Sequence, residues 1–240
     1  MRIGVFDSGV GGLTVLKSLI DEYPNNEYFY IGDNKNNPYG DKNKDELYKY
    51  STKIIDYFIT IKIDLIVIAC NTICSNVYDL LKEKYNIPLI GVIDATIEEF
   101  IKSNEKEVLI MATKATIDSK VYENKIKHYN PNIKVLSIST KELVPLIEKQ
   151  KDTKPIINKY LENYSNINCI ILGCTHYKLI QNNFNKNIKI INSSDGIIKQ
   201  MKKYIKDSKK EITIYTTGNE YLFNKLCYKI TGMKAKKLVL

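Results

Sequence analysis

The chain has 240 residues, of which 44% are hydrophobic, so it can bury a substantial core, and its length fits one large domain or two small ones. No apolar run approaches the roughly 18 residues needed to cross a membrane, and the start at Met1 lacks the charged and apolar regions of a signal peptide, so we expect a cytoplasmic protein with no membrane partner. The formal net charge of +9 would suit nucleic acid if it were gathered on one face, but the lysines are spread along the chain and we do not expect that partner.

Short apolar runs alternate with longer amphipathic ones along the chain. This alternation is typical of parallel β-sheets covered by helices, and it predicts an α/β fold. The predicted strands are residues 2–6, 28–31, 64–68, 88–92, 107–111, 134–138, 168–172, 188–191 and 212–215. Most of the intervals between them have room for one helix.

Capping or turn residues mark the starts of several predicted helices. These are Gly11 and Gly12 before 13–22, Asn43 before 44–60, Asp94 before 96–103, and Thr140 with Glu142 before 142–149. The densest run of lysines, from Lys199 to Lys210, has a spacing that suits the exposed face of a further helix. We interpret that run as a solvated surface.

Two cysteines stand in matching local contexts, each at the end of an apolar run. Cys70 follows residues 66–69 and Cys174 follows residues 170–173, and hydrogen-bonding side chains come directly after each thiol. In open α/β sheets, ligands bind beyond the carboxyl ends of the strands. Two lobes that face each other would therefore place these thiols on opposite walls of one cleft.

The same repeat predicts how the chain divides, since no Gly- or Pro-rich linker marks a boundary. One lobe would comprise residues 1–95 together with 206–240, and the other would comprise residues 96–205. The first lobe would carry Cys70 and the second would carry Cys174.

The other three cysteines lack this context. The total of five is odd, which argues against a disulfide framework and favours free thiols. A buried cysteine outside a functional motif behaves as a small core residue. We interpret three cysteines in this way, namely Cys74, Cys169 and Cys227.

Two opposed thiols can carry out a reaction that a single nucleophile cannot. A thiolate can remove a proton from a carbon atom while a thiol delivers a proton to the opposite face, which inverts a stereocentre without a cofactor. The pKa of a cysteine falls at helix N-termini, so we expect Cys70 and Cys174 to be partly ionised near neutral pH. Asp7 and His176 are candidates to deprotonate or orient the thiol on their respective sides, and Glu148 could hold His176.

Several segments spread over nearly the whole chain match one family. They are Ile3–Gly12, Gly32-Asp33 with Pro38–Gly40, Ala69–Thr72, Val144–Glu148 and Leu172–Tyr177. With them the chain resembles the glutamate racemases of the cofactor-independent aspartate/glutamate racemase superfamily. The resemblance implies two similar lobes, each a mostly parallel sheet flanked by helices. They would be related by a pseudo-twofold axis, with the active site in the cleft between them.

The resemblance also implies a reaction and a set of site residues. The reaction would be racemisation of L-glutamate to D-glutamate for peptidoglycan, with Cys70 and Cys174 as the two bases and without a cofactor or metal. The residues that would line the substrate site are Asp7, Ser8, Tyr39, Gly40, Asn71, Thr72, Thr175 and His176, with Thr113 and Thr116 at its border. The loop Asn34–Asn37 departs from the family pattern, which has a small hydroxyl residue followed by Ala-Arg. Enzymes of this family often dimerise, so a homodimer is a candidate assembly.

Three alternatives stay open. The substrate could be aspartate, because cleft dimensions decide which side-chain length fits. The side chains of Cys70, Cys174, His176 and Asp7 could instead bind zinc, which accepts such ligands. A lysine-driven nucleic-acid role would require salt-dependent association with DNA.

Overall fold

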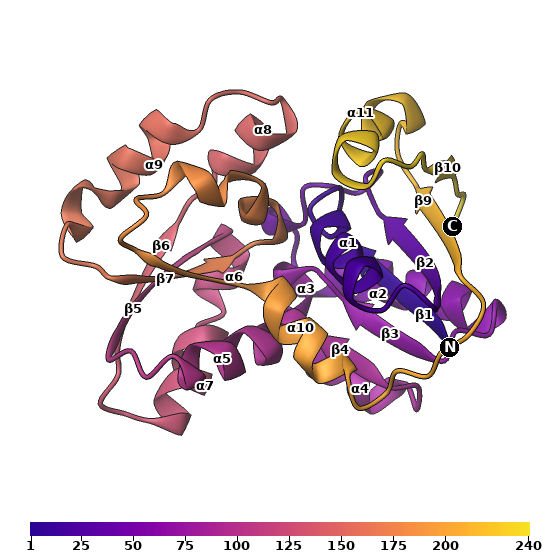
Figure 1. Ribbon diagram of the computed structural model, residues 1–240, viewed down its shortest axis with the longest axis horizontal. Helices are drawn as coiled ribbons and strands as arrows, with labels where there is room; N and C mark the ends of the chain where they lie inside the picture. The colour runs from indigo at the N-terminus through magenta and orange to yellow at the C-terminus, as the bar shows by residue number, and fades with distance from the viewer.

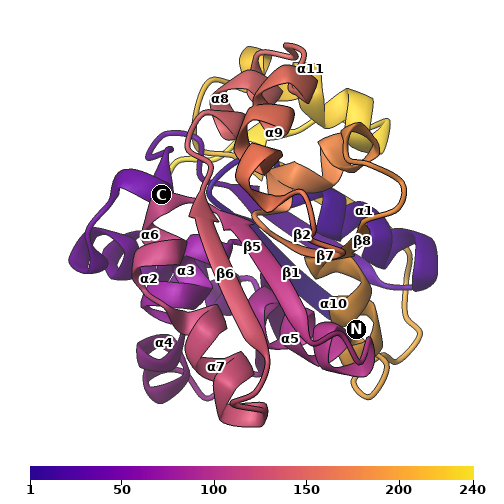
Figure 2. The ribbon, with the colours of Figure 1, turned by 90° about the vertical axis from the view of Figure 1, so that its left-hand side faces the viewer.

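The computed structural model describes residues 1–240 and contains two β-sheets, each flanked by helices (Figures 1 and 2). The six-stranded sheet has the order β10-β9-β2-β1-β3-β4, and the four-stranded sheet has the order β6-β5-β7-β8. Every strand pair is parallel. The predicted fold class is therefore confirmed.

The strands are short, and most are buried on both faces, as parallel strands covered by helices are. Their bounds are β1 Arg2–Asp7, β2 Glu27–Gly32, β3 Leu65–Ile68, β4 Leu89–Gly91, β5 Glu107–Ala112, β6 Lys134–Ser139, β7 Cys169–Gly173, β8 Lys189–Asn192, β9 Glu211–Thr216 and β10 Lys236–Lys237. The first nine lie within one residue of their predicted bounds. The two-residue strand β10 was not predicted.

Helices connect the strands. The α-helices are α1 Leu13–Glu22, α2 Lys44–Thr60, α3 Asn71–Asn76, α4 Tyr78–Lys84, α5 Val92–Lys102, α6 Lys114–Asp118, α7 Val121–Tyr129, α8 Leu143–Glu148, α9 Lys154–Leu161, α10 Ser193–Met201 and α11 Glu220–Thr231. Three 3₁₀ helices complete the set, η1 Tyr39–Asp41, η2 Glu162–Tyr164 and η3 Thr175–Asn183. No helix has the length and apolar character needed to cross a membrane.

The start of α2 follows from its capping residue. Asn43 Oδ1 accepts a hydrogen bond from the Glu46 N–H at 2.9 Å, and Glu46 Oε2 accepts one from the Asn43 N–H at 3.1 Å. This reciprocal pair is a capping box, which satisfies two N–H groups that the helix itself leaves free. The predicted bounds of α1 and α2 are confirmed.

Two capping predictions are wrong. Helix α5 begins at Val92, so Asp94 lies in its first turn, where the carboxylate pairs with Lys125 Nζ at 2.5 Å. Thr140 does not cap α8, because its hydroxyl lies 2.7 Å from the Tyr177 hydroxyl. In both cases the side chain that was predicted to cap a helix forms its contact with a residue distant in the sequence.

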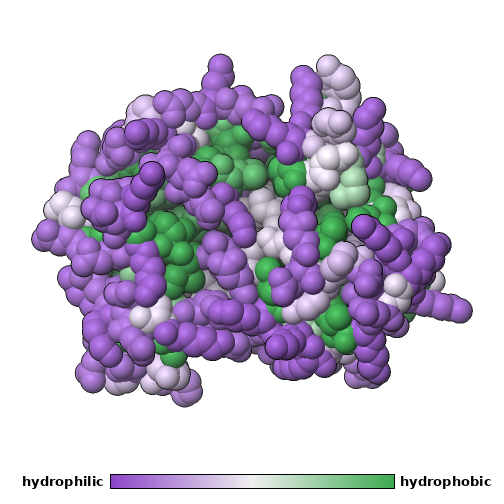
Figure 3. All heavy atoms as spheres, viewed as in Figure 1, coloured by the Kyte–Doolittle hydropathy of each residue, from purple (hydrophilic) through white to green (hydrophobic).

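The lysine-rich segment is not the continuous helix that its spacing predicted. Helix α10 ends at Met201, and residues 205–210 have no regular structure. Lys199 pairs with Glu99 on α5. Hydrophilic side chains cover most of the face shown in Figure 3, as expected for charge spread along the chain.

Two hydrophobic clusters form the core. The larger has 51 buried residues and draws on both sheets, and the smaller has 12 and lies on one side of the four-stranded sheet. Strand β5 divides its side chains between them, since Val108 and Ile110 belong to the larger cluster and Leu109 and Met111 to the smaller. This alternation is the two-residue period of a strand covered on both faces.

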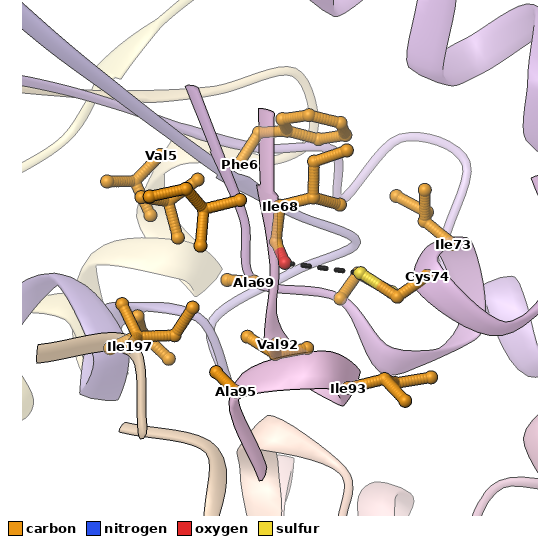
Figure 4. Packing of buried hydrophobic residues seen from close by; sticks show 14 of the residues in the cluster. Val5, Phe6, Ile68, Ala69, Ile73, Cys74, Val92, Ile93, Ala95 and Ile197 are labelled. Carbon is orange, nitrogen blue, oxygen red and sulfur yellow. Dashed lines mark hydrogen bonds between the residues drawn. The ribbon is translucent and has the colours of Figure 1, made fainter. Parts of the chain in front are cut away.

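Helices α5 and α10 form the joint between the two sheets. Helix α5 runs from the six-stranded sheet to the four-stranded sheet, and α10 follows the last strand of the four-stranded sheet and packs against α5 (Figure 1). Ala95 of α5 and Ile197 of α10 lie in the larger cluster (Figure 4). At Gly196 the helices approach so closely that a Cβ atom would overlap with the backbone carbonyl of Ala95.

This contact makes Gly196→Ala a test of the joint. In an unconstrained helix, alanine in place of glycine stabilises by about 0.5–1 kcal/mol. Here the methyl group has no space, so we expect the free energy of unfolding to fall by about 1–3 kcal/mol, the cost of overpacking. Urea denaturation followed by circular dichroism measures the change, with Lys202→Ala at the exposed end of α10 as the control. An unchanged or increased free energy of unfolding for Gly196→Ala would show that α5 and α10 do not pack this closely.

Candidate active site

The two cysteines of the repeat occupy equivalent places in the two sheets. Cys70 follows β3 and is the N-cap residue of α3, and Cys174 follows β7 and is the N-cap residue of η3. In each sheet this is the carboxyl edge of the strands, where loops converge and ligands bind in open α/β folds. Both thiols are buried, and all five cysteines are free, as predicted.

A cavity of about 820 Å³ lies between the loops of the two sheets and contains both thiols in its wall. It also takes in most of the residues that the sequence nominated. Those in the wall are Asp7, Ser8, Tyr39, Gly40, Cys70, Asn71, Thr72, Thr113, Glu148, Cys174, Thr175 and His176. Thr116 is not among them, because it is buried behind Thr113 and contacts its hydroxyl at 3.0 Å.

Asp7 lies beside Cys70 at the end of the neighbouring strand β1. Its Oδ2 atom accepts hydrogen bonds from the Gly12 N–H at 2.9 Å and the Gly9 N–H at 3.3 Å, whereas Oδ1 is buried and has no partner. Burial and this carboxylate raise the pKa of Cys70 well above its ordinary value. The prediction that Cys70 is partly ionised near neutral pH is therefore wrong, because both effects outweigh its place at the helix N-terminus.

Cys174 has a different neighbour. Its Sγ atom lies 3.7 Å from His176 Nδ1, and His176 Nε2 lies 3.1 Å from Glu148 Oε1, so the predicted contact between Glu148 and His176 is present. Burial by itself would lower the pKa of His176, but the interactions with Cys174 and Glu148 raise it well above its ordinary value. Although burial opposes the change, His176 and the amide of Asn37 lower the pKa of Glu148. The imidazole thus connects one thiol to a carboxylate.

The first glycine-rich loop packs directly on this arrangement. A Cβ atom at Gly11 would overlap with the Thr175 hydroxyl and lie 2.5 Å from His176 Nδ1. Glycine is therefore required there by the approach of the loop to η3, which brings the β1–α1 turn against the Cys174 side of the cavity.

Groups suited to a carboxylate are present in the cavity wall. Tyr122 donates a hydrogen bond to Asn71 Oδ1 at 2.6 Å, which fixes the amide so that the buried Nδ2 atom keeps its donors free. The first N–H groups of a helix have no intrahelical acceptor and attract anions, and α3 and η3 both begin in this wall. The Thr72 and Thr113 hydroxyls lie 3.0 Å apart and link the two sheets at this site.

The loop after β2 closes one side of the cavity and is held by one carboxylate. Asp33 accepts hydrogen bonds from the Thr217 and Tyr39 hydroxyls, both at 2.5 Å, and from the Asn36 amide. Burial and Asp33 raise the pKa of Tyr39 well above its ordinary value, so its hydroxyl remains a donor.

The cavity wall also contains residues that the sequence did not nominate for the site. They are Asn37, Pro38, Asp41, Lys114, Lys141, Glu142, Val144, Pro145, Leu146, Lys149, Ile156 and Tyr177. Some of these residues lie inside the segments that resemble the family, and that resemblance could have indicated that they line the site. They are Pro38, Val144–Leu146 and Tyr177. The lysines have no such signal, because an exposed lysine is common at any surface position.

The zinc alternative is not supported by the arrangement of the donors. No three His, Cys, Asp or Glu side chains converge in a group that could hold a metal ion.

Comparison with known proteins agrees with this geometry. The family model for Asp/Glu/Hydantoin racemase matches residues 26–201. A glutamate racemase of Fusobacterium nucleatum is 39% identical over 96% of this chain and 94% of the relative. Among solved structures, a glutamate racemase isoform from Bacillus anthracis superposes with a TM-score of 0.92 at 28% identity, covering 100% of this chain and 97% of that one.

A second solved structure carries a ligand. The glutamate racemase from Francisella tularensis, solved in complex with D-glutamate, has a TM-score of 0.89 at 30% identity and covers 100% of this chain and 97% of its own. The similarity extends over the whole chain and so includes both sheets. The chain therefore belongs to the Asp/Glu/Hydantoin racemase family and is an isomerase.

Proposed function

We propose that the protein interconverts L- and D-glutamate by a two-base mechanism in which Cys70 and Cys174 act on opposite faces of the α-carbon. The observation that carries this proposal is that thiols from two different sheets line one cavity. The relatives named glutamate racemase, at 33–39% identity, support glutamate as the substrate.

The reaction needs one thiolate and one thiol at the start. The thiolate removes the α-proton, and the electron pair of the broken C–H bond stays on the substrate as a carbanion. The opposite thiol then transfers its proton to the other face of the same carbon, so the product has the inverted configuration. The protonation states of Cys70 and Cys174 are exchanged after each turnover, and the reverse reaction starts from the exchanged form.

The neighbours of the two thiols support different resting roles. Cys70, with its raised pKa beside Asp7, is the thiol that donates a proton. Cys174 lies against His176, and a protonated imidazole stabilises a thiolate at that position. Glu148 accepts from His176 and compensates the imidazolium charge.

Short polar groups would bind the carboxylates of the substrate. The only arginine, Arg2, pairs with Glu27 at 2.8 Å at the start of β1 and does not line the cavity. The free amide donors of Asn71 and the N–H groups at the starts of α3 and η3 would take its place. Lys141 and Lys149 in the cavity wall would attract the anionic substrate. Aspartate is the second candidate, since the same groups would bind its carboxylates.

Three further points complete the proposal. The D-glutamate would supply peptidoglycan synthesis in the cytoplasm, as the family resemblance implies.

The two lobes would be residues 1–95 with 206–240 and residues 96–205. The first boundary of this division falls inside α5. A homodimer is the proposed assembly.

Replacing either thiol tests the two-base reaction. We expect Cys70→Ser and Cys174→Ser each to lower kcat for glutamate racemisation by roughly a thousandfold, because a serine hydroxyl is a far weaker acid and base at neutral pH. Chiral chromatography of glutamate measures the rate in both directions, and aspartate is assayed beside it. Cys169→Ala, at the start of the strand that Cys174 follows but outside the cavity wall, is the control and should remain active. Near-normal racemisation by either serine variant would rule out the scheme.

The raised pKa of Cys70 gives a pH prediction. Because burial and the Asp7 carboxylate both raise this pKa, the thiol form persists to higher pH, and the alkaline limb of kcat/KM reflects its loss. In Asp7→Asn the charge is gone, the pKa of Cys70 falls, and the alkaline limb should move to lower pH. A pH profile of kcat/KM measures the shift, with Asp45→Asn on the exposed start of α2 as the control. If the limb stays in place or moves to higher pH, Asp7 does not control Cys70.

A further inference from the structure

The loop after β2 projects one side chain across the cleft. Asp33 fixes this loop through Asn36, Tyr39 and Thr217, and the Lys35 N–H donates to Thr217 Oγ1 at 3.2 Å. Asn37, which lies between the anchored residues Asn36 and Tyr39, is therefore carried on a well-anchored backbone. It is also part of the segment that departs from the family pattern.

Asn37 reaches the carboxylate that holds the imidazole of His176. Its Nδ2 atom donates to Glu148 Oε1 at 3.2 Å, and this is the same oxygen that lies 3.1 Å from His176 Nε2. Glu148 is the last residue of α8, and its side chain is 30% exposed. Without a second partner this carboxylate is free to turn towards solvent and leave His176.

The neighbouring loop leaves space for this contact. A Cβ atom at Gly9 would lie 3.6 Å from both Asn37 Nδ2 and Glu148 Oε1. The hydrogen bond therefore lies beside Gly9, in the turn between β1 and α1 that follows Asp7. It connects the loop that follows β2, in the six-stranded sheet, with α8, which covers the four-stranded sheet.

We propose that Asn37 is a positioning residue that holds Glu148 from across the cleft and so keeps His176 directed at Cys174. The catalytic part of this inference rests on the proposed racemase function, whereas the contact itself does not. Asn37 acts through Glu148 and His176, and its amide spans the two walls of the cavity that the substrate must enter.

Electrostatics agree with the geometry. The groups that lower the pKa of Glu148 against its burial are His176 and the Asn37 amide. The other charged side chains in the cavity wall are Asp7, Asp41, Lys114, Lys141, Glu142 and Lys149. Loss of the amide donor therefore favours protonation of Glu148, and a protonated Glu148 no longer balances the imidazolium of His176.

Two substitutions separate the donor from the shape of the side chain. Asn37→Ala removes the amide, and Asn37→Asp keeps the shape but replaces the donor with a carboxylate that repels Glu148. Lys35→Ala, exposed on the same loop, is the matched control. We expect kcat to fall roughly tenfold in Asn37→Ala, the effect of losing a hydrogen bond to a charged group, and further in Asn37→Asp. KM should change little, because the carboxylate-binding groups lie elsewhere in the wall.

A measurement without substrate tests the contact itself. The chain has two histidines, His176 and the exposed His128, so histidine-selective ¹⁵N NMR resolves the His176 ring. The chemical shift of Nε2 changes when Glu148 is protonated, so it is followed as the pH is lowered. The titration covers only the pH range in which circular dichroism shows that the fold is intact. We expect the protonation of Glu148, seen as a change in the Nε2 signal at acidic pH, to occur at higher pH in Asn37→Ala and at still higher pH in Asn37→Asp.

The outcomes are distinguishable. If Asn37→Asp titrates and turns over like the wild type, shape alone is sufficient and the proposal is overturned; the same holds if Asn37→Ala matches the wild type. If the wild type does not racemise glutamate, the proposed function fails, but the NMR titration still decides whether Asn37 holds Glu148.

Discussion

The close packing of α5 against α10 determines where the two thiols lie relative to each other. Each sheet by itself presents one cysteine at the carboxyl edge of its strands, and the proposed two-base reaction needs both thiols around one carbon atom. The contact at Gly196 and Ala95 joins the sheets through the larger hydrophobic cluster. Packing of two helices outside the cavity wall therefore sets the separation of the thiols on which the proposed reaction depends, since misplacement by even about 1 Å is costly in catalysis.

The two halves of the site are alike in backbone but different in electrostatics. Both thiols follow a strand and begin a helix, yet Cys70 faces the Asp7 carboxylate and Cys174 faces the His176 imidazole. A two-base reaction starts with one proton shared between two equivalent groups, and unequal neighbours decide which group holds it. In the proposed reaction, the similarity between the two sheets would supply the opposed thiols, and their different neighbours would supply the acid and the base.

The sequence was sufficient for the features that depend on local pattern. Nine strands and the start of α2 after Asn43 follow from apolar runs and from residues close together in the chain. What depends on distant partners was not predictable. Asp94 pairs with Lys125 instead of capping a helix, and the thiol form of Cys70 depends on burial and on a carboxylate carried by another strand.

The candidate site shows the same division between local and distant information. The two cysteines and the polar residues that follow each of them were visible in the sequence. The cavity wall contains all but one of the predicted site residues. The contact from Asn37 to Glu148 was not visible, because it joins a loop to a helix end in the other part of the fold. Long-range hydrogen bonds of this kind leave no periodic signal in sequence.

The hydrogen isotope content of substrate and product during the first turnovers in deuterated water tests the central claim most directly. If two thiols act on opposite faces, newly formed D-glutamate carries deuterium at Cα from the donating thiol, while the remaining L-glutamate keeps its original hydrogen. Mass spectrometry of the separated enantiomers measures both. Equal early deuterium in substrate and product, or retention of the original α-hydrogen in the product, would mean that a single group serves both faces and would contradict the account.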